Sequence, residues 1–220
     1  MENNPEKIST RQKILENAIH LFAIKGYTET TIRELAAAVG VKEGSLYNHF
    51  PSKNAILERI LEEYAQISSN LFVESKLDTL QDTLKNNPTA NSILSCLRLS
   101  FPAGKEKYYI KQLCVILQEQ YRNPLVRKFM TEEYLMGTEN ASRTVIDKLK
   151  ELNVLRQDTN TDYWAKTHSS LMYAFSSRML LGIGDQSPDF SGMGLRELLW
   201  NMYDSMLKTC GIENKKEWHA

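Results

Sequence analysis

Apolar residues recur three and four positions apart along almost the whole chain, and this spacing restricts the fold more than any other feature. It places side chains on one face of an α-helix, whereas the strict alternation that is typical of half-buried strands is missing. Clusters of Gly, Pro, Asn and Ser interrupt the pattern, and we expect about nine or ten helices between them. The interruptions fall at residues 26–27, 40, 51, 86–88, 102–104, 123–124, 153–162 and 182–194. The sequence therefore predicts an all-α protein.

The size and composition of the chain are those of a protein that folds in water. Its 220 residues favour one small and one larger unit, and 42% of them are hydrophobic while 25% are charged. No segment approaches the roughly 18 to 20 consecutive apolar residues of a membrane span. The first seven residues, MENNPEK, lack the basic start and apolar run of a secretory signal. We expect a cytoplasmic protein without a membrane partner.

The three cysteines give no sign of a disulfide framework or a metal site. Cys96, Cys114 and Cys210 are odd in number, widely separated and not arranged as C-x-x-C. We interpret them as core thiols, and we expect neither a metal nor a cofactor.

The first predicted helix has a clear start and stop. Ser9 and Gln12 have the spacing of a capping box, in which two side chains satisfy the free backbone N–H groups, and Gly26 ends the helix. Between them a buried face is predicted from Ile14, Leu15, Ala18, Ile19, Leu21 and Phe22.

The second predicted helix is short and is followed by a very tight turn. Thr31 and Glu34 form another capping box, and the apolar stripe consists of Ile32, Leu35, Ala36 and Val39. Gly40 ends this helix, and only Val41 and Lys42 precede the next helical stretch, GSLYNHF. Two helices joined in this way cross steeply, and the small Ala36 lets them approach. This is the steric pattern of a helix-turn-helix.

The third predicted helix presents polar residues on the side opposite its buried face. At about 100° per residue, Leu46 and Phe50 define the buried direction, so Gly44 and Asn48 point outward. Ser45 lies beside them, and Tyr47 and His49 lie on the flanks. A recognition helix in a DNA major groove needs this arrangement, because a small residue allows close approach and an amide can pair with adenine. The alternative is that these residues form only the solvent face of a small helical bundle.

Four polar side chains in this region are placed for the phosphate backbone. They are Lys42, Tyr47, His49 and Lys53. The net charge of the chain is zero, and residues 1–57 contain seven Lys and Arg against six Glu. Attraction to phosphate must therefore come from the placement of charges and not from a large basic field.

The stretch from Thr30 to Lys53, TTIRELAAAVGVKEGSLYNHFPSK, resembles the signature of TetR-family regulators. The resemblance covers roughly residues 9–57. It implies a three-helix DNA-binding head, a homodimer that binds a double-stranded DNA operator, and a ligand pocket in the C-terminal helices whose occupancy releases DNA. It also implies that Thr31 contacts phosphate, that Gly44 and Ser45 lie against bases, and that Tyr47, Asn48, His49 and Lys53 complete the contact.

Lys42 departs from the family pattern, which often has Ser or Thr at this position to cap the third helix. A lysine caps nothing and lies unfavourably beside the positive end of a helix. Glu43 compensates in part. We predict that residues 42–46 are frayed in the free protein and become ordered on DNA.

The resemblance divides the chain into two parts. We expect a tail and DNA-binding domain at residues 1–52 and a helical effector-binding and dimerisation domain at residues 53–220. The run from Lys53 to about Leu84 has the pattern of one long helix. It is either a lever that transmits ligand occupancy to the head or a rigid strut.

Two helices near the C-terminus, at residues 163–183 and 195–207, are apolar on more than one face. Such helices favour a four-helix interface between two subunits, and burial in the subunit's own core is the alternative. The candidate interface residues are Leu171, Phe175, Met179, Leu195, Leu199, Met202 and Met206.

Aromatic and soft side chains in the central helices are the candidates for an effector pocket. They are Tyr108, Tyr109, Cys114, Tyr121, Tyr134, Trp164, Met172 and Tyr173. A pocket with such a lining would take an apolar or aromatic small molecule, with tyrosine hydroxyls fixing its orientation.

An enzyme is not indicated. The sequence contains no G-x-S-x-G, P-loop or H-E-x-x-H motif, and its four histidines are scattered. The sequence favours a transcriptional repressor that a small-molecule effector releases from its operator. The alternative is a helical interaction or ligand-binding module with an impaired DNA-binding head.

Overall fold

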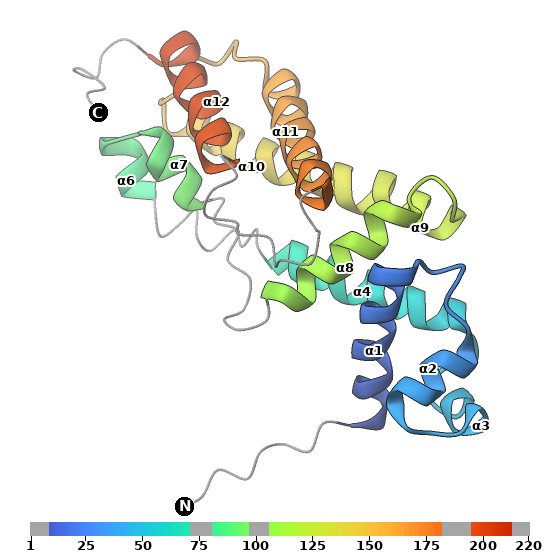
Figure 1. Cartoon of the computed structure of the whole chain (residues 1–220). Coiled ribbons are helices and arrows are strands. Elements are labelled where there is room, and N and C mark those ends of the chain that lie inside the picture. The colour runs from blue at the N-terminus through green and yellow to red at the C-terminus, as the bar shows by residue number, and fades with distance from the viewer. Residues whose placement is uncertain (1–8, 71–80, 97–105, 182–194, 213–220) are drawn as a thin grey trace, which may run out of the picture. The chain divides into compact units, whose positions relative to one another are not determined.

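The computed structural model describes residues 9–70, 81–96, 106–181 and 195–212, and these are almost entirely helical (Figure 1). Extended backbone in these ranges pairs only as an isolated bridge between Leu155 and Gly211. The all-α prediction is therefore confirmed for the described part of the chain. None of the helices found there combines the length and apolar character that crossing a membrane requires.

The helices begin and end close to the predicted breaks. They are α1 (Thr10–Lys25), α2 (Ile32–Val39), α3 (Glu43–Tyr47), α4 (Lys53–Asn70), α6 (Gln81–Asn86), α7 (Ala90–Cys96), α8 (Glu106–Glu119), α9 (Pro124–Phe129), α10 (Met136–Glu151), α11 (Thr161–Leu181) and α12 (Leu195–Cys210), with a π-helical segment at Met130–Leu135. The run predicted as one long helix is helical from Lys53 to Asn70 and again in α6, and residues 71–80 lie outside the described residues.

Contacts between residues divide the chain into two compact units that do not follow chain order. The first unit comprises residues 1–66 and 102–130, and the second comprises residues 67–101 and 131–220. The first three helices thus share a unit with α8, α9 and most of α4. The division into domains at residues 52 and 53 stays a prediction.

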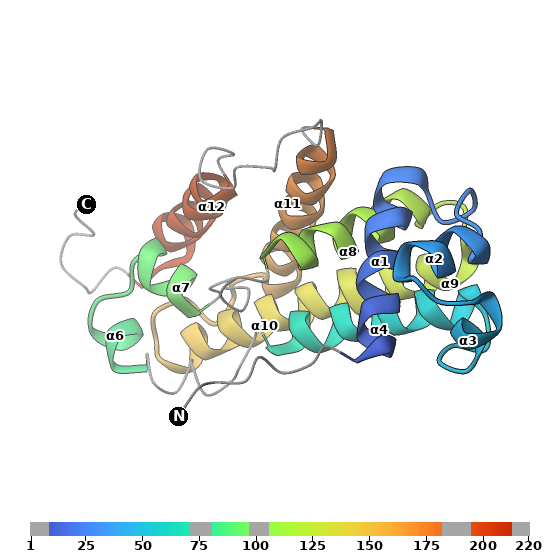
Figure 2. The same cartoon turned by 60° about the horizontal axis from the view of Figure 1, so that its bottom comes forward.

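The first unit is built around α1, which packs against α2 and crosses α8 (Figure 2). The predicted face of α1 is buried, apart from Leu21, which is half-buried. Its buried apolar residues include Ile14, Leu15, Ala18, Ile19, Phe22, Leu35, Ala36, Leu46, Phe50, Ile56, Leu57 and Ile60. Each of the first four helices therefore buries apolar side chains.

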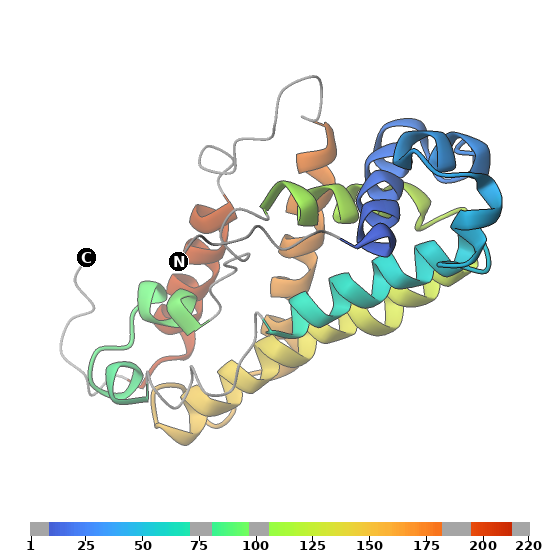
Figure 3. The same cartoon turned by 90° about the horizontal axis from the view of Figure 1, so that it is seen from below.

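The second unit has a core between α7, α10 and α12, and Figure 3 shows α7 beside α12. Its members are Leu84, Ala90, Ile93, Val145, Ile146, Leu149, Val154, Leu155, Met202, Tyr203, Met206 and Leu207. Trp164 and Leu171 of α11 pack against this core from its edge.

Burial within the single chain bears on the predicted dimer interface, which stays a prediction. Leu199, Met202 and Met206 are 5%, 6% and 0% exposed, and for these three residues the structure favours the alternative of burial in the subunit's own core. The physical reason is that α12 lies against both α7 and α11, and these two helices cover more than one of its faces. Phe175 is also buried, whereas Leu171 is half-buried. The side chains of Met179 and Leu195 lie outside the described residues.

Candidate nucleic-acid interface

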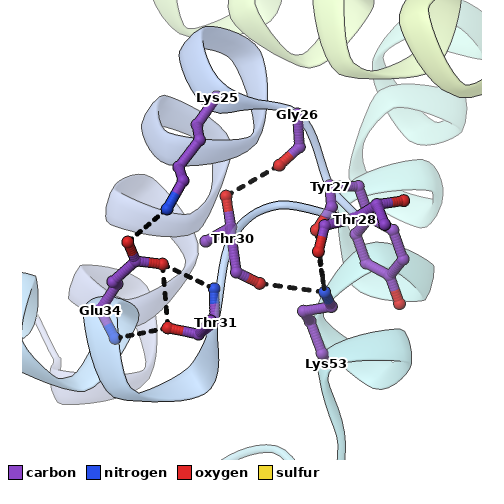
Figure 4. Close-up of polar contacts among 8 residues, drawn as sticks. All are labelled: Lys25, Gly26, Tyr27, Thr28, Thr30, Thr31, Glu34 and Lys53. Carbon is purple, nitrogen blue, oxygen red and sulfur yellow. Dashed lines mark hydrogen bonds and ion pairs between the residues drawn. The ribbon is translucent and has the colours of Figure 1, made fainter.

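The predicted caps position the first two helices. The Ser9 hydroxyl accepts from the Gln12 backbone N–H at 3.2 Å, although the Gln12 amide donates to Glu16 and does not complete a box. The capping box at the start of α2 is complete, because Thr31 and Glu34 each accept from the other's backbone N–H (Figure 4). Each end of the α1–α2 connection is therefore fixed, at Gly26 with φ 93° and at Thr31.

The turn between α2 and α3 has the geometry that a helix-turn-helix needs. Gly40 has φ 77° and ψ 33°, the left-handed conformation that glycine adopts at little cost. Its N–H donates to carbonyls of the last turn of α2, and the Val41 N–H donates to the Ala36 carbonyl at 3.0 Å. Ala36 is 2% exposed. The turn and the small residue at the crossing are both confirmed.

Helix α3 shows the predicted division into a buried and an outward side. Leu46 and Phe50 are 0% and 1% exposed, whereas Gly44 and Asn48 are exposed, and so is Tyr47. Ser45 and His49 are half-buried on the flanks. A Cβ added at Gly44 would meet no atom within 4 Å, so the space in front of this residue is open.

The helix itself is shorter than predicted. It ends at Tyr47, and Asn48 is its C-terminal cap with φ −67° and ψ −21°. These angles are still helical, so Asn48 keeps the outward direction that the helical wheel gave it. The Lys42 side chain makes no capping hydrogen bond, as the departure from the family pattern predicted.

Glu34 is the most strongly perturbed carboxylate near the start of α2. It forms an ion pair with Lys25 and accepts from the Thr31 N–H at 2.8 Å and the Thr31 hydroxyl at 2.9 Å (Figure 4). The hydrogen bond from Lys25, followed by those from Thr31, lowers the pKa of Glu34 to about 2. Because the Thr31 hydroxyl proton is already donated, a phosphate contact by Thr31 would require it to leave Glu34. That contact stays a prediction.

The Lys53 ammonium contacts backbone carbonyls in the DNA-free chain, and its predicted phosphate contact stays a prediction. The ammonium donates to the backbone carbonyls of Tyr27, Thr28 and Thr30 at 2.8, 3.3 and 3.0 Å (Figure 4). It also lies 4.4 Å from the centroid of the Tyr27 ring. Burial is the main cause that lowers the pKa of Lys53. Carbonyl acceptors belong to every residue type, so no residue pattern in the sequence could have indicated this contact.

Sequence reasoning also missed two contacts that join distant parts of this region. The Arg11 guanidinium lies 4.5 Å from the centroid of the Phe50 ring, and Lys25 pairs with Glu34. Glu34 was identified from the capping box, but its partner Lys25 was not. The Arg11–Phe50 contact joins residues that no local spacing relates.

The predicted effector-pocket residues are divided equally between the two units. Tyr108, Tyr109, Cys114 and Tyr121 belong to the first unit, and Tyr134, Trp164, Met172 and Tyr173 belong to the second. The Tyr108 hydroxyl donates to Glu63 at 2.7 Å, and the Tyr134 hydroxyl lies 2.9 Å from the Ser176 hydroxyl. Tyr121 is 73% exposed. The pocket therefore stays a prediction.

Other chemistry at these residues is limited. Burial raises the pKa of the Cys114 thiol to about 11, which keeps it protonated and unreactive. In the described ranges, no three His, Cys, Asp or Glu side chains come together as a group that could hold a metal ion.

The fold and this site define the class of helix-turn-helix DNA-binding proteins with a helical body. Residues 14–60 match the family model of bacterial regulatory proteins, tetR family. The chain is 25% identical over 174 residues to the HTH-type transcriptional regulator YerO of Bacillus subtilis. The aligned region covers 69% of this chain and 58% of YerO. The chain is 49% identical over 49 residues to IcaR of Staphylococcus aureus, a negative regulator of the icaADBC biofilm operon. This aligned region covers 22% of this chain and 26% of IcaR. Both matches span less than two thirds of the relative.

Solved structures extend the similarity to the whole fold. The SmeT–triclosan complex superposes with a TM-score of 0.64 at 16% identity, covering 94% of both chains. The TetR-family regulator PfmR of Thermus thermophilus gives a TM-score of 0.58 at 20% identity, covering 91% of this chain and 99% of PfmR. The N-terminal segment of the chain is thus similar to the TetR family, and the chain has the fold of TetR-family regulators.

Proposed function

We propose that this protein is a homodimeric transcriptional repressor that binds a specific DNA operator and leaves it when a small molecule binds the helical body. One observation carries the proposal: α3 presents Gly44, Tyr47 and Asn48 to solvent while Leu46 and Phe50 anchor its other side. A helix in this arrangement enters a major groove with an amide directed at base edges. The alternative is a helical interaction or ligand-binding module with an impaired DNA-binding head.

The comparisons support the regulatory direction and the effector. IcaR, whose N-terminal segment is 49% identical, is named a negative regulator. Two structures of the same fold contain small molecules, triclosan in SmeT and choline in a regulator from Saccharomonospora viridis. The effector of this chain is proposed to be apolar or aromatic, because aromatic side chains dominate the candidate residues. We propose no catalytic role, since the named relatives are transcriptional regulators, and we propose that the protein acts in the cytoplasm.

The proposal is tested by selecting bound sequences from a random DNA pool with the purified protein. Enrichment of one sequence with two related half-sites is the expected result, because a dimer presents two recognition helices about 34 Å apart. Binding of the selected DNA should weaken steeply as salt rises. A pool without enrichment would contradict the proposal.

Asn48→Ala tests the amide as the base-reading group. We expect it to weaken binding to the selected operator by about 1 to 3 kcal/mol while binding to random DNA changes little. The matched control is Asn91→Ala, which removes an exposed amide from α7 in the other unit. Equal losses on operator and random DNA would rule out base recognition by Asn48.

A further inference from the structure

The side chain of Arg11 connects the start of α1 with the end of the helix-turn-helix. Its guanidinium carbon is 4.5 Å from the centroid of the Phe50 ring, and the buried Phe50 follows α3 in the chain. Arg11 itself is exposed and is the second residue of α1. The contact therefore places a permanent positive charge beside the residues that follow α3.

The contact with the ring leaves the hydrogen-bonding groups of Arg11 unused. A guanidinium has five N–H donors in one plane, and the face of an aromatic ring attracts its charge without using this planar fork of donors. Within the described ranges, the guanidinium has neither a hydrogen-bond acceptor nor an acidic partner. Phe50 thus fixes the position of a cation whose donors remain available to a ligand.

The position of Arg11 is unfavourable for α1 on its own. The N-terminal end of a helix carries a partial positive charge, and the first turn of α1 contains no acidic residue that would compensate a cation there. A bound anion reverses this effect, because the free backbone N–H groups and the guanidinium then share one negative partner. An apolar side chain such as methionine could cover the Phe50 ring as well as an arginine does. Packing alone therefore does not account for a charge at this position.

We propose that Arg11 is a further DNA-contacting residue, which binds a backbone phosphate through two parallel N–H···O bonds while Phe50 holds its guanidinium in place. Arginine forms such paired bonds to phosphate with defined geometry. A phosphate contact fixes how a protein lies on the duplex and carries no sequence information. The role of Arg11 on the operator rests on the proposed function, whereas the phosphate contact itself extends to DNA of any sequence.

The first experiment measures the salt dependence of DNA binding by Arg11→Met. Methionine keeps a long apolar side chain next to Phe50 and removes the charge and all donors. On the selected operator and on a random duplex of the same length, binding should weaken several-fold. The slope of log K against log salt should become shallower by about 0.9 for each bound subunit, because one phosphate contact is lost. Arg11→Lys retains the charge without the planar fork, so it should bind more weakly than the wild type with nearly the wild-type slope.

The control for removing an exposed arginine is Arg122→Met. Arg122 is exposed in the same unit and follows α8, whose Gln118 side chain donates to the Ala23 carbonyl near the opposite end of α1. This variant should keep the wild-type slope on both duplexes. A change of slope in Arg122→Met as large as that in Arg11→Met would overturn the proposal.

The second experiment separates a phosphate contact from a merely structural role. Amide hydrogen exchange of residues 43–50 in free Arg11→Met should match that of the wild type, because Phe50 stays covered. Faster exchange together with an unchanged salt slope would show that Arg11 only supports the packing of α3, and would overturn the phosphate contact.

The two proposals fail in different ways. A wild type that binds the random duplex but enriches no sequence from the pool would contradict operator recognition, and the slopes on the random duplex would still decide on Arg11. Enrichment of an operator with an unchanged slope in Arg11→Met would overturn the role of Arg11 alone. A wild type that binds no duplex at all would contradict both.

Discussion

Single buried residues show how the second unit tolerates polar groups in its core. His168 on α11 is 2% exposed, and its Nδ1 lies 3.1 Å from the Tyr203 hydroxyl, with the two rings edge to face. The Tyr203 hydroxyl also lies 3.5 Å from the Ser142 hydroxyl. These described partners are neutral, so they do not compensate a charge on the imidazole. Burial lowers the pKa of His168 to about 4.

This histidine should make the second unit less stable in acid. Its pKa lies below the unperturbed value of about 6.5, so the stabilisation from the neutral form is complete above pH 6.5 and is lost as pH falls toward 4. The free energy of unfolding should decrease by at most about 1.4 kcal/mol per pH unit in this window. Denaturant unfolding between pH 7 and 4 measures it. His168→Gln should flatten the profile, whereas the exposed His20→Gln should retain it. Identical profiles for the wild type and His168→Gln would contradict the prediction.

At the scale of elements, α3 depends on packing more than on its own helical stability. It has five residues, its N-cap Lys42 provides no side-chain hydrogen bond, and isolated helices of this length do not form in water. Leu46 and Phe50 hold it against the core of the first unit. Its first turn is therefore the part that can fray and become ordered on DNA.

Lys42→Ser should supply the missing cap. A serine at this position can accept from the N–H of Gly44 or Ser45, and such caps contribute about 1 kcal/mol. Amide exchange of residues 43–46 should slow in the free variant. In the wild type, the same amides should slow when operator is added. Equal protection of the wild type with and without operator would contradict fraying.

Element boundaries set by local chemistry were predictable, and those set by distant contacts were not. Thr31 and Gly40 were identified as caps because the residue types and spacing determine the backbone locally. The outward direction of Asn48 followed from helical geometry alone. The burial of Met202 and Met206 depends on where α7 and α11 lie, so the sequence could not decide between the dimer interface and the subunit's own core. The Lys53 ammonium contacts carbonyls more than 20 residues away, and this contact had no signal in the sequence.

At the scale of the whole molecule, dimerisation requires an apolar face that the second unit leaves uncovered. Helix α12 uses most of its apolar residues in its own core, but Leu198 is 41% exposed. Tyr163, at the start of α11, is 59% exposed. Isologous interfaces place the same face of both subunits in contact. If this face of α12 forms the interface, the dimer buries two copies of Leu198, one from each subunit.

Leu198→Glu should therefore weaken the dimer without unfolding the chain. The wild type should sediment at twice the chain mass of 25.3 kDa, and the variant should dissociate at concentrations about tenfold or more above the wild-type midpoint, because two buried carboxylates replace two leucines. The control is Ile24→Glu, which changes a residue that is 71% exposed in the first unit and should leave the mass unchanged.

A dissociated variant should also bind a single half-site with little loss but the two-site operator far more weakly, because the second head no longer binds as part of the same molecule. An unaltered dimer in Leu198→Glu would place the interface on another face, and a wild type that sediments as a monomer would contradict the homodimer.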